Sequence, residues 1–297
     1  MTNSFNGNDV ATISLKIATE DLGLASHFYR DAETDFGAGS GSTVQVGIPG
    51  VTTVGTRAVG SSEDFVLGSV AESTTDVTLT TEAYAVVPVT LAENDLNLKN
   101  LTKQVIRPSA LSVANHIDNA VAAVLSGVTK SATIAYDATS PKASVIRARA
   151  ALRANGVSAD MTVNPIRVLA GSTVYADMLL AEEIDNANGL DRIAGLPVYE
   201  STMIGADDLF VFIPSSIAVA IRAPRVPMGA ALGGTSREGG MALSTWQALD
   251  AKSGTTLSTT IALLGVKALD LPVADYENGI VNMVPGGGMI AINTTGA

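Results

Sequence analysis

The residue types that could carry out chemistry are few in this sequence, and none stands in a recognisable catalytic pattern. The chain has 297 residues, with two histidines, His27 and His116, and no cysteine. Disulfides, thiolate metal sites and cysteine nucleophiles are therefore excluded. Two separated histidines supply neither a metal cluster nor a Ser–His–Asp arrangement. We expect both to be ordinary surface or interface residues.

Acidic pairs and glycine-rich stretches offer the remaining candidates for chemistry. Asp207–Asp208 and Glu182–Glu183 could act as a catalytic dyad or bind a cation, but both pairs lie in polar breaks where carboxylates usually face water. The stretch GAGSGS at 37–42 lacks the third glycine of a dinucleotide loop, and no P-loop pattern occurs. The sequence predicts a protein that is not an enzyme and has no cofactor or metal site.

The composition indicates a well-buried chain that does not bind nucleic acid tightly. Hydrophobic residues make up 46% of the chain, aromatic residues 4% and charged residues 16%, and the net charge is −11. Residues 1–35 carry an excess of acids, so a basic nucleic-acid-binding arm is absent there. No apolar stretch of membrane-spanning length and no secretory signal pattern occurs. We expect no membrane association and synthesis in the cytoplasm.

The elements that would position any site begin with a strand of alternating character, ESTTDVTLTTEAYAVVPVT at 72–90. One face carries Val77, Leu79, Ala83, Ala85, Val87 and Val89, and most of these side chains are small. With the strand predicted at 43–50, we expect 43–90 to form a long two-stranded ribbon. Its second arm would be about 46 Å long if straight, against a radius of gyration of about 19 Å for a compact chain of this length. We therefore expect the ribbon to project.

A long helix gives the strongest periodic signal. Pro108 predicts a break, after which Ser109 can cap a helix that ends at Gly127. Val113, Ile117, Val121 and Val124 share one face of this helix. At about 26 Å it is long enough to serve as the spine of a domain.

The rest of the chain reads as an α+β protein. Residues 1–42 suggest an extended arm around one short helix over 19–33, with Thr19 as its N-cap. Residues 128–234 alternate helices and short strands, including a helix from Pro141 to Gly156. Residues 254–270 predict a long strand, and 271–297 remain as a tail.

Three segments carry a resemblance to a known family. VIRPSALSVANHIDNAVAAVLSG (105–127) resembles the spine helix of tailed-bacteriophage major capsid proteins, where an Arg–x–Pro–Ala-type break precedes L-x-x-x-I-D. LDRIAGLPVYES (190–201) resembles the I-A-G-x-x-V-x-x-S strand of that family's axial domain. FGAGSGSTVQVGIPG (36–50) resembles the G-x-x-V-x-V-x-x-P entry to its extended loop. The three segments also occur in the family's order.

The resemblance implies the α+β Hong Kong 97-type capsid fold. It implies an N-terminal arm (1–42), an extended β-hairpin loop (43–90), a peripheral domain with spine helix and long strands (91–127 and 235–297) and an axial domain (128–234). The implied function is that of a bacteriophage major capsid protein, a structural virion protein that self-assembles into pentamers and hexamers of an icosahedral shell around double-stranded DNA. Assembly would take place in the host cytoplasm. The implied partners are other copies, a portal, and a separate scaffolding or decoration protein, with packaged DNA contacted only non-specifically.

We expect the small apolar face of 72–90 to lie across a neighbouring subunit, because small side chains let a flat ribbon lie close. An arm and ribbon folded entirely onto their own subunit would contradict this interpretation. The residues expected at contacts between subunits are Val77, Leu79, Tyr84, Val87, Phe28, Tyr29, Arg57, Glu63 and Asp64.

Two features set the sequence apart from some members of that family. No lysine occurs between Lys16 and Lys99, so we expect no covalent cross-link through the loop. The sequence from Met1 shows no long helical scaffold, which favours a separate scaffolding protein or none.

Three alternatives stay open at this stage. The first is an encapsulin-like compartment shell protein that shares the fold, which would need a cargo-binding site on its inner face. The second is a tail-tube or adhesin protein, suggested by the Thr/Val/Gly-rich strands and opposed by the long helix. The third is an enzyme of unrecognised class, which the missing catalytic set disfavours.

Overall fold

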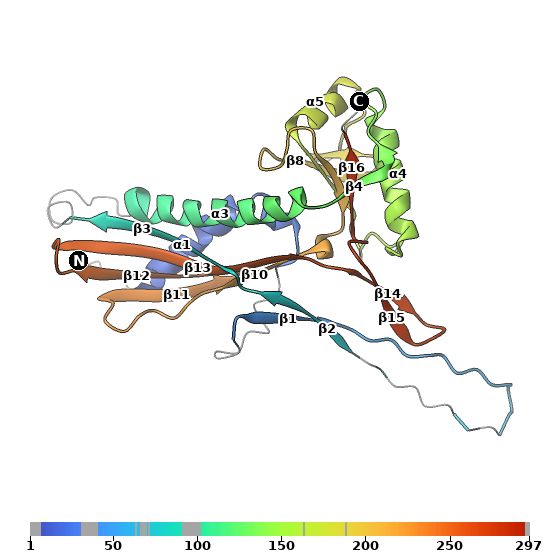
Figure 1. The fold of residues 1–297 in the computed structure, drawn as a ribbon, viewed down its shortest axis with the longest axis horizontal. Helices are drawn as coiled ribbons and strands as arrows, with labels where there is room; N and C mark the ends of the chain where they lie inside the picture. The colour runs from blue at the N-terminus through green and yellow to red at the C-terminus, as the bar shows by residue number, and fades with distance from the viewer. Residues whose placement is uncertain are drawn as a thin grey trace. The chain divides into compact units, whose positions relative to one another are not determined.

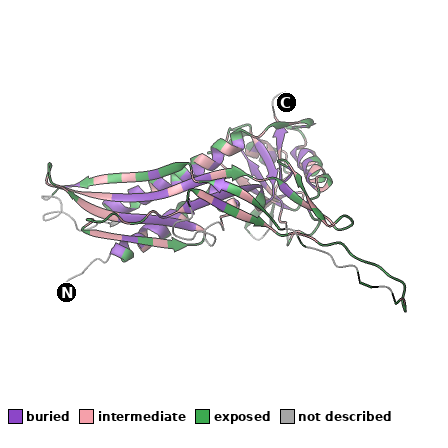
Figure 2. Cartoon of the chain, turned by 60° about the horizontal axis from the view of Figure 1, so that its bottom comes forward, coloured by how far each residue is buried: buried purple, intermediate pink, exposed green. Residues whose placement is uncertain are grey.

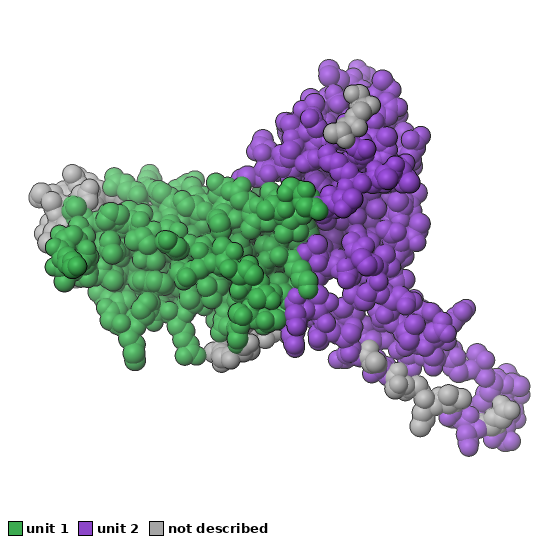
Figure 3. All heavy atoms as spheres, viewed as in Figure 1, with its two compact units in different colours: residues 1–44, 77–127, 217–267 green, residues 45–76, 128–216, 268–297 purple. Residues whose placement is uncertain are grey.

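The chain folds as a mixture of helices and sheets (Figure 1). A computed structural model describes residues 7–30, 41–62, 64–65, 70, 72–90, 102–162, 164–187 and 189–294. Contacts divide the chain into two compact units (Figure 3). Unit 1 comprises residues 1–44, 77–127 and 217–267, and unit 2 comprises residues 45–76, 128–216 and 268–297.

Unit 1 is built on an antiparallel sheet covered by helices. The sheet order is β10-β13-β12-β11, and β3 also pairs with β13. The helices α1 and α3 pack against each other, α1 against β11 and β12, and α3 against β3. The bounds are α1 (Gly7–Asp21), β3 (Thr81–Val89), α3 (Arg107–Ser126), β10 (Ile217–Arg222), β11 (Leu232–Glu238), β12 (Met241–Asp250) and β13 (Thr255–Ala268).

The long helix α3 begins earlier than predicted. Pro108 was expected to break the helix, but it lies in the first turn of α3, where a missing N–H costs no hydrogen bond. A π-helical turn, η2 (Thr102–Ile106), precedes it directly. Ser109 therefore does not cap the helix, and its hydroxyl donates to the carbonyl of Val105 at 2.8 Å. The predicted inward face is confirmed at Val113, Ile117 and Val121, which are buried.

The predicted N-terminal helix is wrong in position. Residues Gly7–Asp21 form α1, a 3₁₀ turn η1 (Leu24–His27) follows, and the Thr19 hydroxyl donates to the carbonyl of Leu15 inside α1 at 2.8 Å. The buried face of α1 packs on unit 1, because small residues allow a close approach. A Cβ on Gly234 would lie 2.4 Å from the carbonyl oxygen of Gly7. The described part of the N-terminal arm thus covers its own subunit.

The alternation of β3 is confirmed, but its expected cover is not. Ala83 and Val89 are buried, whereas Tyr84 on the other face is 67% exposed. The strand pairs antiparallel with β13, placing Ala83 opposite Ala262. Its apolar face packs against α3 of the same chain. The prediction that a neighbouring subunit covers this stretch is therefore wrong for 81–89.

The ribbon is consequently shorter than expected. It consists of β1 (Thr43–Ile48) paired with β2 (Ser73–Thr78). At Leu79 the backbone N–H still donates to Ser42, at 2.7 Å, while the N–H of Thr80 donates to Leu264 of β13 at 3.0 Å. The alternating stretch thus leaves the ribbon at Leu79 and joins the unit 1 sheet.

Unit 2 contains a seven-stranded sheet of order β4-β16-β9-β5-β8-β7-β6 and a separate two-stranded sheet, β14-β15. The predicted helix from Pro141 is α4, and the helix over "STVYADMLL" is α5. Together with the sheet they enclose a core that includes Val145, Leu152 and Ile166. The bounds are β4 (Lys130–Ala135), α4 (Pro141–Ala154), β5 (Arg167–Ala170), α5 (Ser172–Leu180), β6 (Asp185–Ala187), β7 (Leu190–Ile193), β8 (Leu196–Glu200), β9 (Leu209–Phe212), η3 (Pro214–Ser216), β14 (Leu271–Asp275), β15 (Ile280–Val284) and β16 (Met289–Asn293).

The units differ from the predicted domains at two places. Strand β10 was assigned to the axial domain (128–234), but it lies in the sheet of unit 1. Strands β14, β15 and β16 were assigned with the spine helix in 235–297, but all three lie in unit 2, where β16 pairs with β9 and β4. In both cases hydrogen bonding across the sheet, rather than position along the chain, decides membership.

Candidate inter-subunit surface

Between β1 and β2 lies the part of the predicted 43–90 loop that is outside any strand, residues 49–72, called the extended loop from here on. Its described residues are mostly exposed (Figure 2). Its described residues form no helix or strand. Val54 and Phe65 are each 75% exposed, and Val59 and Val70 are exposed as well. Exposed apolar side chains gathered on one segment mark an interaction surface.

A cation–π contact links two positions of the extended loop. The guanidinium of Arg57 stacks over the ring of Phe65, with Cζ 3.9 Å from the ring centroid. Such a contact contributes about 0.5–1 kcal/mol at an exposed site. The contact brings the segment around Arg57 close to the segment around Phe65. A partner would meet a cation beside an aromatic ring there.

The residues expected at contacts between subunits fall into two groups, of which the first remains accessible. Arg57 and Asp64 are exposed on the extended loop, and Tyr84 is exposed on β3. Leu79 and Val87 are half-buried. Glu63 lies outside the described residues.

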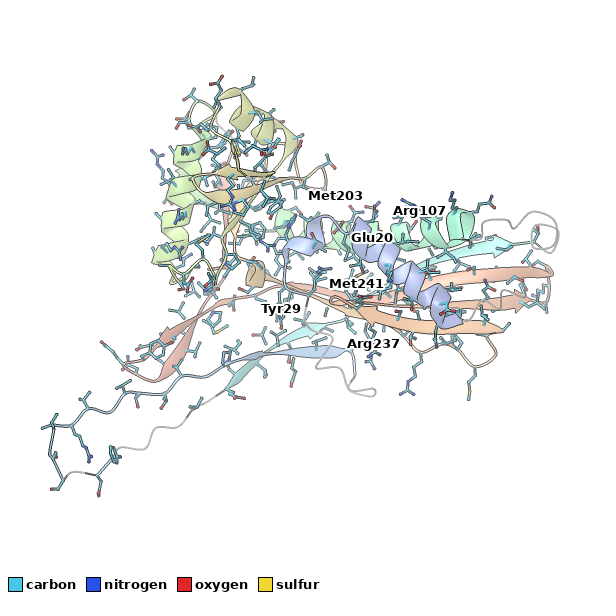
Figure 4. All side chains as sticks on the ribbon, turned by 180° about the vertical axis from the view of Figure 1, so that it is seen from behind. Glu20, Tyr29, Arg107, Met203, Arg237 and Met241 are labelled. Carbon is cyan, nitrogen blue, oxygen red and sulfur yellow. The ribbon has the colours of Figure 1, made fainter. Side chains whose placement is uncertain are left out.

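The second group is held within its own subunit by burial or by backbone pairing, and the Tyr29 side chain is half-buried. Phe28 and Val77 are buried within the chain. Tyr29 pairs with β10 through its backbone, donating to Ile217 at 3.3 Å and accepting from Val219 at 3.0 Å; Figure 4 labels its side chain. Phe28 and Val77 thus belong to the core of their own chain.

A residue whose role the sequence did not reveal, Asp118, fixes the N-terminal segment. It is the aspartate of L-x-x-x-I-D on α3, and it is buried. Its carboxylate accepts the backbone N–H of Gly23 at 2.9 Å and of Ala25 at 2.7 Å. Burial lowers the pKa of the Arg30 guanidinium, while the negative charge of Asp118 acts in the opposite direction. The L-x-x-x-I-D motif includes Asp118, but the sequence does not indicate that its carboxylate binds the backbone of the N-terminal segment.

One member of each acidic pair has a structural partner. Asp208 forms an ion pair with Lys130, with 3.0 Å between Oδ1 and Nζ. Glu183 accepts the backbone N–H of Lys142 at 2.5 Å, at the start of α4, where a carboxylate complements the helix dipole. Within the described ranges no group of three or more His, Cys, Asp or Glu side chains could hold a metal ion.

Two tyrosine–aspartate pairs stabilise unit 2. The hydroxyl of Tyr136 donates to Asp177 at 3.2 Å, and burial together with this carboxylate raises the pKa of Tyr136. The hydroxyl of Tyr175 donates to Asp191, and this hydrogen bond raises the pKa of Tyr175 to about 12. Both tyrosines are thus held protonated and act as hydrogen-bond donors.

Comparisons of the sequence with known protein families and curated proteins give no match. No protein-family model matches the chain, and no curated protein matches its sequence. Among the helices that the structure describes, none combines the length and hydropathy needed to cross a membrane.

Solved structures, by contrast, match over most of the chain. The capsid of Ralstonia phage GP4 has a TM-score of 0.54 at 11% identity, covering 93% of this chain and 90% of that chain. The capsid of cyanophage P-SCSP1u has a TM-score of 0.53 at 11% identity, covering 87% and 85%. A structure from Mycobacterium phage Che8 has a TM-score of 0.51 at 14% identity, covering 90% of both. The chain therefore has the fold of tailed-phage capsid proteins, the Hong Kong 97-type fold.

Proposed function

We propose that this chain is a major capsid subunit, many copies of which assemble into the icosahedral shell of a tailed bacteriophage. The observation that carries the proposal is the likeness of fold to phage capsid structures over 87–93% of the chain. The extended loop supports it independently, since its apolar side chains Val54 and Phe65 are each 75% exposed.

The extended loop supplies a physical route to assembly. Covering one Val or Phe side chain on a neighbouring subunit stabilises the contact by about 1.5–3 kcal/mol. A loop that lies on the next copy makes a head-to-tail contact, and such contacts repeat around a ring until the geometry closes it. Pentamers and hexamers that share this contact then close a shell, in which many modest contacts add up.

The charge of the chain suits a DNA container. A protein with a net charge of −11 does not bind phosphate backbones tightly, so packaged double-stranded DNA stays mobile.

The proposed partners are other copies of this chain, a portal, and a separate scaffolding or decoration protein. The proposed location is the virion, assembled in the host cytoplasm.

Electron microscopy of the purified full chain tests this function. We expect closed, uniform shells, formed by the chain alone or with a scaffolding protein from the same genome. Tubes, or subunits that stay monomeric under every assembly condition, would overturn the proposal. Shells that enclose a protein cargo and never DNA would indicate a compartment instead.

A deletion within the extended loop tests its role in assembly. Removing residues 51–71 joins Gly50 to Glu72 and keeps both β1 and β2, whereas a deletion through residue 75 would cut into β2. We expect a folded subunit, shown by an unchanged circular dichroism spectrum, that makes no shells. Normal shells from this variant would exclude the extended loop as an assembly contact.

A further inference from the structure

The hairpin β14–β15 in unit 2 was expected to be part of a tail, yet it is firmly anchored. Leu271 at its base is buried in the unit 2 core, and Val273 packs against that core. A Cβ on Gly156 would lie 2.7 Å from Val273 Cγ2, so the glycine permits close packing of the strand. The base of the hairpin is thus fixed.

The tip of the hairpin is held in one conformation. The Asp275 carboxylate accepts the backbone N–H of Glu277 at 3.1 Å, and both the backbone N–H (3.1 Å) and the side-chain amide (2.7 Å) of Asn278. Gly279 follows with φ +65°, and a Cβ there would lie 2.8 Å from Thr53 Cγ2 of the extended loop. A turn that is ordered before binding loses little entropy when a partner arrives.

This ordered tip presents exposed apolar side chains. Tyr276 is 63% exposed and Ile280 is 49% exposed, and Met283 farther along β15 is exposed as well. Two-stranded hairpins are marginally stable in water, so an exposed apolar face gains stability from a partner. The contact between Gly279 and Thr53 makes the tip continuous with the extended loop.

Charge indicates which surface the tip fits. Residues 268–297 contain Asp270, Asp275 and Glu277 and no lysine, arginine or histidine. Residues 217–237 of unit 1 contain Arg222, Arg225 and Arg237 and no acid, and Glu238 follows directly at the end of β11. In that segment Arg225 is exposed, and Met228 is 104% exposed. Arg225 thus lies near the exposed side chain of Met228, and Glu277 lies beside the exposed side chain of Tyr276, so the two sites combine exposed apolar atoms with opposite charges.

We propose that the hairpin tip, Tyr276–Ile280, binds the segment Arg225–Met228 of a second copy of this chain, with Glu277 facing Arg225. This contact rests on the proposed shell function and adds a second interface beside the extended loop. Apolar contact in the centre and an ion pair at the rim is the usual composition of such interfaces. The ion pair sets the register, while the apolar side chains supply most of the stabilisation.

Because the chain has no cysteine, disulfide trapping is a clean test. Two single variants of the full chain, Tyr276→Cys and Met228→Cys, are purified, mixed under assembly conditions and oxidised. A disulfide between positions 276 and 228 then joins two different molecules, because each carries one cysteine. We expect this linked peptide by mass spectrometry. Leu180→Cys in place of Tyr276→Cys is the control, because Leu180 is exposed on α5 but lies outside the proposed contact.

A charge exchange tests the pairing itself. Glu277→Arg and Arg225→Glu should each reduce shell yield at least tenfold, and the double variant should restore it, with unchanged melting temperatures because both side chains are exposed. Single variants that assemble like the wild type, or a double variant that is not restored, would overturn the contact. Trapping of the 276–228 disulfide without any closed shell would support the contact and refute the shell function. Shells without the disulfide would refute only the contact.

Discussion

The carboxylate of Asp118 on α3 accepts the backbone N–H of Ala25 at 2.7 Å, across 93 positions of the chain. With the second hydrogen bond from Gly23, it fastens the N-terminal segment to the long helix. A buried carboxylate that accepts two N–H groups is strongly held, because its charge strengthens both bonds. The N-terminal segment is thus part of the folded subunit.

Asp118→Asn should weaken this attachment. The amide keeps one acceptor oxygen and turns an NH₂ group toward a backbone N–H, so one buried donor loses its partner. We expect the free energy of unfolding to fall by about 1–3 kcal/mol, measured by urea denaturation. Asn119→Ala, on the exposed side of the same helix, is the control and should change stability by less than about 0.5 kcal/mol. Equal stability of the two variants would contradict the role assigned to Asp118.

Gly234→Ala should loosen α1. The added Cβ would lie 2.4 Å from the carbonyl oxygen of Gly7, so the start of the helix must move away from β11. We expect a loss of stability on the order of 1–3 kcal/mol and faster hydrogen exchange in α1. Thr235→Ala, at an exposed position on the same strand, serves as the control. Unchanged exchange in α1 after Gly234→Ala would show that the close approach is not required.

The sequence predicted elements whose pattern is local and missed those that depend on packing. The alternation in β3 and the face of α3 with Val113 and Ile117 follow directly from residue order. Helix α1 was missed because its sequence, GNDVATISLKIATED, holds β-branched residues of low helix propensity, and packing on the sheet stabilises it.

The sequence of a strand also does not indicate which surface covers its apolar face. The apolar face of β3 needed a partner, and alternation could not distinguish α3 of the same chain from a neighbouring subunit. Arg57 and Asp64 are exposed, as expected of charged residues on a Gly/Ser-rich loop, and their contact with a neighbouring subunit stays a prediction. Phe28 is buried within its own chain, and a buried aromatic residue has the same sequence signature as an interface aromatic residue.

The tyrosines of unit 2 predict a pH dependence. The hydrogen bond to Asp191 raises the pKa of Tyr175 from 10.0 to about 12. Because the folded pKa is the higher one, this stabilisation is complete below about pH 10 and is lost as the pH rises through about 12. In an ultraviolet titration of phenolate absorbance, Tyr175→Phe should remove a step near pH 12. Loss of a step near pH 10 instead would show that the hydrogen bond does not form.

Assembled particles should contain no covalent links between subunits through the extended loop. A cross-link of that kind needs a lysine amine, and residues 17–98 contain none. On a denaturing gel, boiled particles should therefore run as a single band near 30.3 kDa. Particles treated with an amine cross-linker provide the positive control. A ladder of multimers from untreated particles would contradict the prediction.

The most direct test is a cryo-electron microscopy map of the particle that the full chain forms, resolved well enough to trace residues 49–62. We expect a closed shell in which this part of the extended loop lies on a neighbouring copy, with Val54 covered there. A loop that contacts only its own subunit, or a protein that forms no closed particle, would contradict it.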